Sequence, residues 1–120
     1  MFKNEVQFAF FNPKQAYENY EKAIEMNPKD PKAYIHRGKY RFKIKDIEGA
    51  IENYDKAIEL DSNNATAFNN RANANLEMGK LKQAMADYSK AIELNPQYAL
   101  AYYNRGLLRT DLGRVPTANV

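Results

Sequence analysis

The chain of 120 residues holds few side chains that could carry out covalent or metal chemistry. It has one histidine, His36, and no cysteine, which excludes thiolate nucleophiles and zinc sites of the cysteine type. A serine nucleophile such as Ser89 needs a base within hydrogen-bond reach, and the spacing of these residues and the carboxylates indicates no such pair. We therefore expect no enzyme activity, no metal and no cofactor. His36 is interpreted as a surface or ligand-facing residue rather than a general base.

Basic residues gather in the run from Lys39 to Lys45, where cations alternate with apolar side chains. On a helix this alternation spreads the charges around the cylinder instead of along one stripe. The net charge of +3 is also modest beside the positive field that nucleic-acid binding requires. We expect no nucleic-acid partner.

The composition predicts a folded chain that does not insert into a membrane. Hydrophobic residues make up 44% of the sequence and charged residues 28%, which is enough apolar material for a core and too much charge for a membrane span. The opening segment MFKNEVQFAFF is too short and too often interrupted by polar residues to be a signal-peptide core. A cytoplasmic location is the resulting expectation.

The sequence repeats itself at an interval of 34 residues, and this period must position every side chain considered above. The aligned columns are Ala16/Ala50/Ala84, Tyr20/Tyr54/Tyr88, Ala23/Ala57/Ala91, Tyr34/Phe68/Tyr102, Arg37/Arg71/Arg105 and Gly38/Ala72/Gly106. Periods of this size indicate a stacked array in which each unit buries its apolar face against its neighbours.

Each unit is predicted to be a pair of helices. In residues 47–60 the apolar and small residues recur three and four positions apart, which is typical of an amphipathic helix. Residues 31–44 form a second helical segment, with Asp30 as N-cap and Pro31 in the first turn. Connections of a few residues make the two helices antiparallel.

Glycines mark the expected helix ends. Gly79 and Gly113 can adopt the left-handed conformation that closes a helix. Lys45 stands in the same column one unit earlier, where a left-handed conformation costs about 1–2 kcal/mol for a residue other than glycine.

Small residues in the alanine columns let two helix backbones approach closely, and the aromatic columns fill the space beside them. An aromatic residue, then Gly or Ala, then a spaced Ala, Tyr and Ala on a 34-residue period resembles the tetratricopeptide repeat. The resemblance implies an all-α, right-handed superhelical array of about three and a half units. Residues 31–64 and 65–98 are expected to be complete units, 13–30 the second helix of a partial unit, 99–120 the first helix of a truncated unit plus a tail, and 1–12 a degenerate or irregular segment.

The same resemblance implies that the first helix of each unit lines a concave groove for a peptide or another protein. Helical spacing selects the residues on the exposed face of those helices. They are Lys32, Ile35, His36, Lys39 and Lys43 in the first complete unit, Thr66, Asn69, Asn70, Asn73 and Glu77 in the second, and Leu100, Tyr103, Asn104, Leu107 and Asp111 in the last helix.

This face is predicted to change from basic through amide-rich to aromatic and apolar, which suggests a partner segment with acidic residues near one end. The alternative interpretation treats Lys39 and Lys43 as ordinary solvated charges and the asparagines as a bias in composition. One subclass of the family clamps the C-terminal carboxylate of a chaperone with Lys, Asn and Arg at set places. Those places fall on Ile35, Lys39, Asn70, Leu100 and Asn104, and only Asn70 matches, so we expect no chaperone-tail binding.

The column of Arg37, Arg71 and Arg105 has two interpretations. In the structural one, each aliphatic stem packs between helices and the guanidinium reaches a carboxylate or carbonyl, with Asp87 as the expected partner of Arg71. In the functional one, the three cations form a ladder for phosphate or acidic groups.

The predicted array leaves its ends open. Tyr102, Leu108 and Leu112 are expected to be exposed at one end, and Phe2, Phe8, Phe10 and Phe11 lie at the other. Residues 1–12 could fold back, chains could stack end to end, or the sequence could be cut from a longer array. The second function hypothesis is therefore a self-associating scaffold that stacks through its terminal helices.

Overall fold

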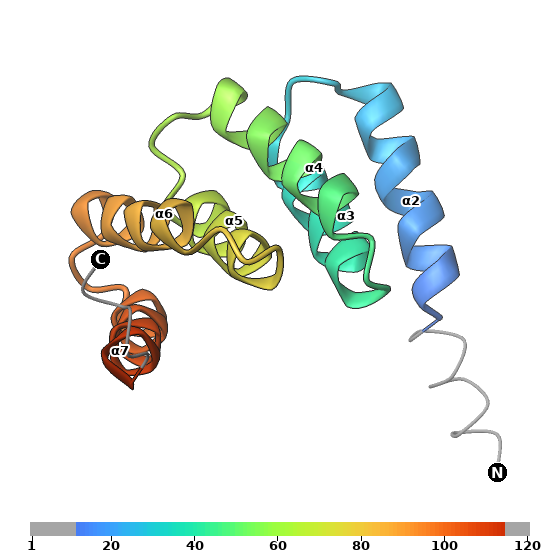
Figure 1. Ribbon diagram of the computed structural model, residues 1–120. Helices are drawn as coiled ribbons and strands as arrows, with labels where there is room; N and C mark the ends of the chain where they lie inside the picture. The colour runs from blue at the N-terminus through green and yellow to red at the C-terminus, as the bar shows by residue number, and fades with distance from the viewer. Residues whose placement is uncertain (1–11, 115–120) are drawn as a thin grey trace, which may run out of the picture.

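The computed structural model describes residues 12–114, which form helices and no strand. The helices are α2 (Pro13–Met26), α3 (Pro31–Lys43), α4 (Ile47–Leu60), α5 (Ala65–Glu77), α6 (Leu81–Leu94) and α7 (Ala99–Arg114). They follow one another as packed neighbours along a curved array from α2 to α7 (Figure 1). The expectation of an all-α array of helix pairs is confirmed.

Side-chain caps begin α2 and α3, and the cap of α3 is the one predicted from the sequence. The Asp30 carboxylate accepts a hydrogen bond from the Lys32 N–H at 3.0 Å, and Pro31 occupies the first turn of α3. Asn12 caps α2 in the same way, with its Oδ1 3.0 Å from the Lys14 nitrogen. Each cap satisfies a backbone N–H that has no partner inside the helix.

The turns that end α3 and α5 have the same left-handed geometry. Gly79 has φ 75° and Lys45 has φ 72°, so Lys45 adopts the conformation that favours glycine. The prediction for Gly113 is wrong, because α7 continues through it to Arg114. Glycine permits a left-handed conformation without requiring it, and within residues 12–114 no second helix follows α7 to fix a turn there.

In the two complete units the small residues of the alanine columns are buried between packed helices. Ala50, Ala57, Ala84 and Ala91 are all 0% exposed, which confirms the predicted close approach. Tyr54 and Tyr88 fill the adjacent space and are 2% and 1% exposed. At Gly38 an added Cβ would lie 2.6 Å from Tyr54 Cε1, so even alanine would require the Tyr54 ring or the helices to shift.

The predicted pairing of Arg71 with Asp87 is confirmed. Arg71 Nε and Nη2 donate to the two Asp87 oxygens, each at 2.9 Å, and Nη1 donates to Asp55 at 2.9 Å. The hydrogen bond with Asp87 is the main reason that the pKa of Arg71 is raised, although burial opposes it. This guanidinium joins α5 to both α4 and α6.

The other two arginines of the column have the same structural placement. Arg37 Nη1 lies 3.6 Å from Glu21, and Arg105 Nη1 lies 3.2 Å from the Ser89 hydroxyl. Each guanidinium also lies over the aromatic residue three positions earlier, at 5.9 Å for Arg37 and 5.6 Å for Arg105. The column therefore ties neighbouring helices together, as the structural interpretation predicts.

At α7 the expected exposure of apolar residues is only partly correct. Tyr102 is 45% exposed, but Leu108 is 2% exposed and packs with Ala72, Ala84 and Tyr88. The prediction for Leu108 is wrong because this residue faces back toward the preceding unit. The four phenylalanines expected at the other end lie outside the described residues. No helix within residues 12–114 is long and apolar enough to cross a membrane.

Candidate functional site

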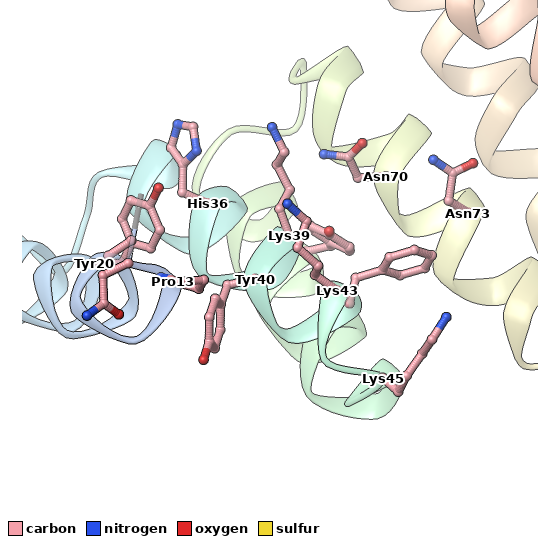
Figure 2. Close-up of a pocket in the computed structure, with 13 residues that line it drawn as sticks. Pro13, Tyr20, His36, Lys39, Tyr40, Lys43, Lys45, Asn70 and Asn73 are labelled. Carbon is pink, nitrogen blue, oxygen red and sulfur yellow. The ribbon is translucent and has the colours of Figure 1, made fainter. Parts of the chain in front are cut away.

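A groove of about 810 Å³ runs between α3 and α5 and extends onto α2. Figure 2 shows Asn70 and Asn73 on α5 opposite the side of α3 that carries His36, Lys39 and Lys43. The described residues that line it are Asn12, Pro13, Ala16, Tyr20, His36, Lys39, Tyr40, Phe42, Lys43, Lys45, Tyr54, Asn70 and Asn73. Its volume lies in the range of sites that hold a small ligand or a short stretch of peptide.

The groove is positively charged. Lys39 and Lys43 project from α3, and Lys45 follows in the turn that ends this helix (Figure 2). None of the described residues that line the groove is acidic. The three ammonium groups also form no ion pair within residues 12–114. An anionic group entering the groove would therefore meet cations that are not already neutralised by a neighbouring carboxylate.

His36 adds a neutral ring to this basic surface. The imidazole stacks on Tyr20, with ring centroids 5.3 Å apart and an interplanar angle of 16°. Burial of the ring lowers the pKa of His36 below its ordinary value, the charge of Lys39 lowers it further, and Asp30 partly opposes both. The lowered pKa favours the neutral imidazole, which can donate and accept hydrogen bonds.

Two asparagine side chains form the opposite wall. Asn70 is partly exposed, and Asn73 is held in place because its Oδ1 accepts a hydrogen bond from the Tyr88 hydroxyl. Burial raises the pKa of Tyr88 to about 12, so this hydroxyl keeps its proton and remains a donor. Because the Asn73 oxygen already accepts the Tyr88 hydroxyl, the NH₂ group of Asn73 is the part that can bind a ligand.

The prediction that Ile35 and Asn69 are exposed is wrong. Ile35 is 6% exposed and belongs to the core cluster around Tyr54, and Asn69 is 0% exposed. Asn69 Oδ1 accepts a hydrogen bond from Asn104 at 3.4 Å. The first helices of neighbouring units contact each other at these residues, so the exposed face of each helix is narrower than helical spacing alone indicates.

The structure brings together five of the predicted lining residues, namely His36, Lys39, Lys43, Asn70 and Asn73. Asn104 is half-buried beside Asn69 and lies outside this groove. The others are exposed but do not line it: Lys32, Thr66, Glu77, Leu100, Tyr103, Leu107 and Asp111. A role for these residues in binding remains a prediction.

The lining residues that the sequence did not reveal come mainly from α2 and from aromatic positions. Tyr20 shares a column with Tyr54 and Tyr88, so its position indicates a core residue rather than a groove residue. Within residues 12–114, however, α2 has no first helix of its own unit beside it, and the Tyr20 ring opens toward His36. Tyr40 and Phe42 also line the groove, and their only sequence signal was the mixed run from Lys39 to Lys45.

Helix pairs stacked on a fixed period around an open groove define a helical repeat protein. Comparison with family models agrees with this class: a model described as TPR repeat matches residues 38–79 and 76–113, and one described as Tetratricopeptide repeat matches residues 19–52. The chain belongs to the tetratricopeptide repeat family. No curated protein matches it at a significant level.

Several solved structures share this fold. The first TPR of Spaghetti (RPAP3), bound to the HSP90 peptide SRMEEVD, has a TM-score of 0.81 and 23% identity, covering 92% of this chain and 88% of that one. The Arabidopsis OM64 TPR domain has a TM-score of 0.81 and 24% identity, covering 89% of this chain and 88% of that one. YrrB, described as a TPR protein with an unusual peptide-binding site, has a TM-score of 0.76 and 31% identity, covering 81% of this chain and 50% of YrrB.

Proposed function

We propose that the chain is a non-enzymatic interaction module whose groove between α3 and α5 binds an extended, acidic segment of another protein. The observation that carries this proposal is the lining itself, which holds Lys39, Lys43 and Lys45 and, among residues 12–114, no acidic side chain. A partner with acidic side chains would gain charge-assisted hydrogen bonds from these ammonium groups.

Each part of the groove suits a different part of such a segment. The amides of Asn70 and Asn73 can hydrogen-bond to the main chain of an extended ligand. The lining also includes the rings of Tyr20, Tyr40 and Phe42, which offer apolar surface for hydrophobic side chains of the partner, the kind of contact that usually dominates binding energy. The expected partner segment therefore carries acidic residues next to an apolar anchor.

The similar structures support a peptide as the class of ligand. The first TPR of Spaghetti (RPAP3) is solved with the HSP90 peptide SRMEEVD, and the second TPR domain of human RPAP3 with the HSP70 peptide SGPTIEEVD. Both peptides contain two adjacent glutamates. At the places where the family's chaperone clamp has Lys, Asn and Arg, this chain matches only at Asn70. We therefore propose an internal acidic segment as the partner rather than a chaperone tail.

The proposal is tested with a display library of random twelve-residue peptides. Selection on the 120-residue protein is expected to enrich peptides that combine Asp or Glu with an aromatic or aliphatic residue. The double variant Lys39→Glu/Lys43→Glu is expected to bind the best peptide at least about tenfold more weakly, a loss of about 1.4 kcal/mol. Fluorescence anisotropy measures the dissociation constant, which should also rise with salt concentration.

The matched control is Lys80→Glu/Lys82→Glu, which makes the same change in net charge at the start of α6, away from the groove. Acidic residues are tolerated at a helix N-terminus, so this variant should fold normally. It is expected to bind the peptide as the unmodified protein does. Enrichment without acidic residues, or an equal loss of affinity in both double variants, would exclude the proposed site.

A further inference from the structure

Helix α7 presents a face that is covered in the complete units. Gly106 stands in the column of Gly38, where an added Cβ would lie 2.6 Å from Tyr54 of α4. At Gly106 an added Cβ would meet nothing within 4 Å. Tyr102 is likewise 45% exposed, whereas Tyr34 in the same column is 7% exposed. Within residues 12–114, α7 therefore lacks the second helix that α4 supplies to α3.

Helix α2 presents the complementary face. In α4, Tyr54 and Ala57 belong to the same core cluster as Tyr34 and Ile35 of α3 and are 2% and 0% exposed. Their counterparts 34 residues earlier are Tyr20, which is half-buried, and Ala23, which is exposed. In the described part of the chain, α2 therefore corresponds to the second helix of a unit, and no first helix of that unit packs against it.

We propose that α2 of one copy packs on α7 of the next, as α4 packs on α3 within the chain, so that copies join head to tail. In this arrangement the Tyr20 ring enters the space beside Gly106, and Ala23 allows the two backbones to approach closely. The two faces differ, so the contact is heterologous and each addition leaves a new free end. This assembly goes beyond the proposed binding function.

A polar match favours a second copy as the occupant. Inside the chain Arg41 of α3 donates to Asn53 Oδ1 of α4 at 3.2 Å. The same columns place Arg109 on α7 and Asn19 on α2, and both are exposed. Packing of α2 on α7 would bring these two residues together in the same relation. The two faces are thus complementary: Gly106 leaves space for the Tyr20 ring, and Arg109 can donate a hydrogen bond to Asn19.

Light scattering of the 120-residue protein over a range of concentrations tests the proposal. The mass is expected to rise above the 13.8 kDa of one chain and to pass the dimer without a plateau. Gly106→Leu fills the space that receives Tyr20, and Ala23→Arg blocks the close approach from the other side. Both positions are exposed in the single chain, so each variant is expected to fold normally and to remain monomeric.

Mixing the two variants gives a more specific result. Each retains one intact face, so an equimolar mixture of Gly106→Leu and Ala23→Arg should form one interface and stop at the mass of a dimer. The control Asp111→Leu adds the same side chain at another exposed position of α7 and should assemble as the unmodified protein does. A constant mass of one chain, a plateau of the unmodified protein at the dimer, or assembly of either single variant would overturn the proposal.

Discussion

Arg71 and Asp87 form a polar contact between neighbouring helices that is largely shielded from water. The Asp87 side chain is 9% exposed, and besides both Arg71 bonds it accepts a hydrogen bond from Asn75 Nδ2 at 3.0 Å. The Asp55 side chain binds the same guanidinium but is 54% exposed. One arginine thus has a buried partner and a solvated one.

Removing the charge of the buried partner should cost much more stability than removing that of the exposed one. Asp87→Asn is expected to lower the free energy of unfolding by about 1–3 kcal/mol, because Arg71 keeps its charge and loses a shielded acceptor. Asp55→Asn should cost less than about 1 kcal/mol, since water replaces the lost contact. Urea denaturation of both variants provides the comparison, and equal losses would contradict this assignment.

Equivalent positions in the two complete units form the same hydrogen bond, but the charged residue is the donor in one unit and the acceptor in the other. In the first complete unit a cation, Arg41, donates to the amide of Asn53 at 3.2 Å. In the second, the amide of Asn75 donates to the carboxylate of Asp87 at 3.0 Å. The donor stays on the first helix and the acceptor on the second, so the contact is kept although the residues differ.

The pH response of His36 follows from its position in the groove. Its pKa is lowered from 6.5 by burial and then by Lys39, so the unfolded chain binds the proton more readily than the folded one. The stabilising contribution of the neutral ring is complete above about pH 6.5 and is lost as the pH falls through the folded-state pKa. Lys39→Gln should move the pKa upward, because it removes one of the two causes.

NMR titration checks this directly, because the chain has a single histidine. Lys43→Gln serves as the control and should leave the titration unchanged, since Lys43 is not among the groups that shift the pKa. A His36 pKa at or above 6.5 in the unmodified protein would contradict the described environment.

At the scale of the elements, the alanine columns set the distance between helices. Ala84 is 0% exposed and packs against Ala72, Tyr88 and Leu108. Ala84→Leu is expected to lower the free energy of unfolding by about 1–3 kcal/mol, because the added carbons have no space. Ala86 is exposed on the same helix, so Ala86→Leu should change stability by no more than about 0.5 kcal/mol. Thermal or urea unfolding distinguishes the two.

The turns that end α3 and α5 permit a reciprocal experiment. Lys45 and Gly79 have nearly the same positive φ, and only glycine adopts it without strain. Lys45→Gly is expected to raise the free energy of unfolding by about 0.5–1 kcal/mol, the relief of strain being partly offset by greater freedom of the unfolded chain. Gly79→Lys should lower it by a similar amount. A loss of stability in Lys45→Gly, measured by urea denaturation, would argue against strain at this turn.

At the scale of the whole molecule, the candidate groove belongs to no single unit. Its lining comes from α2, α3, α4 and α5, so its width depends on how neighbouring helix pairs stack. The array measures 54 by 36 by 27 Å, and such an elongated form exposes a large side surface relative to its core. Stacking therefore creates both the groove and the open faces of the terminal helices.

Much of this architecture could be predicted from the sequence because its causes are local or periodic. Asn12 and Asp30 cap helices through bonds to residues two or three positions away. The columns of Ala50 and Ala57 recur at a fixed interval, and residues so placed meet the same neighbours in each unit. The pairing of Arg71 with Asp87 was predictable for another reason, because a guanidinium packed between helices needs a carboxylate or carbonyl partner.

Other features were decided only by the tertiary structure, because burial depends on which helix covers a face. Tyr20 and Tyr54 share a column, yet Tyr20 opens to the groove and Tyr54 is buried. Asn69 falls on the predicted exposed stripe but is covered where α5 meets α7. The sequence by itself determined the repeating helix pair, its caps and its small-residue contacts. The neighbours around each pair decided which equivalent side chains form the core and which face a partner, since a period describes one unit and not what lies against it.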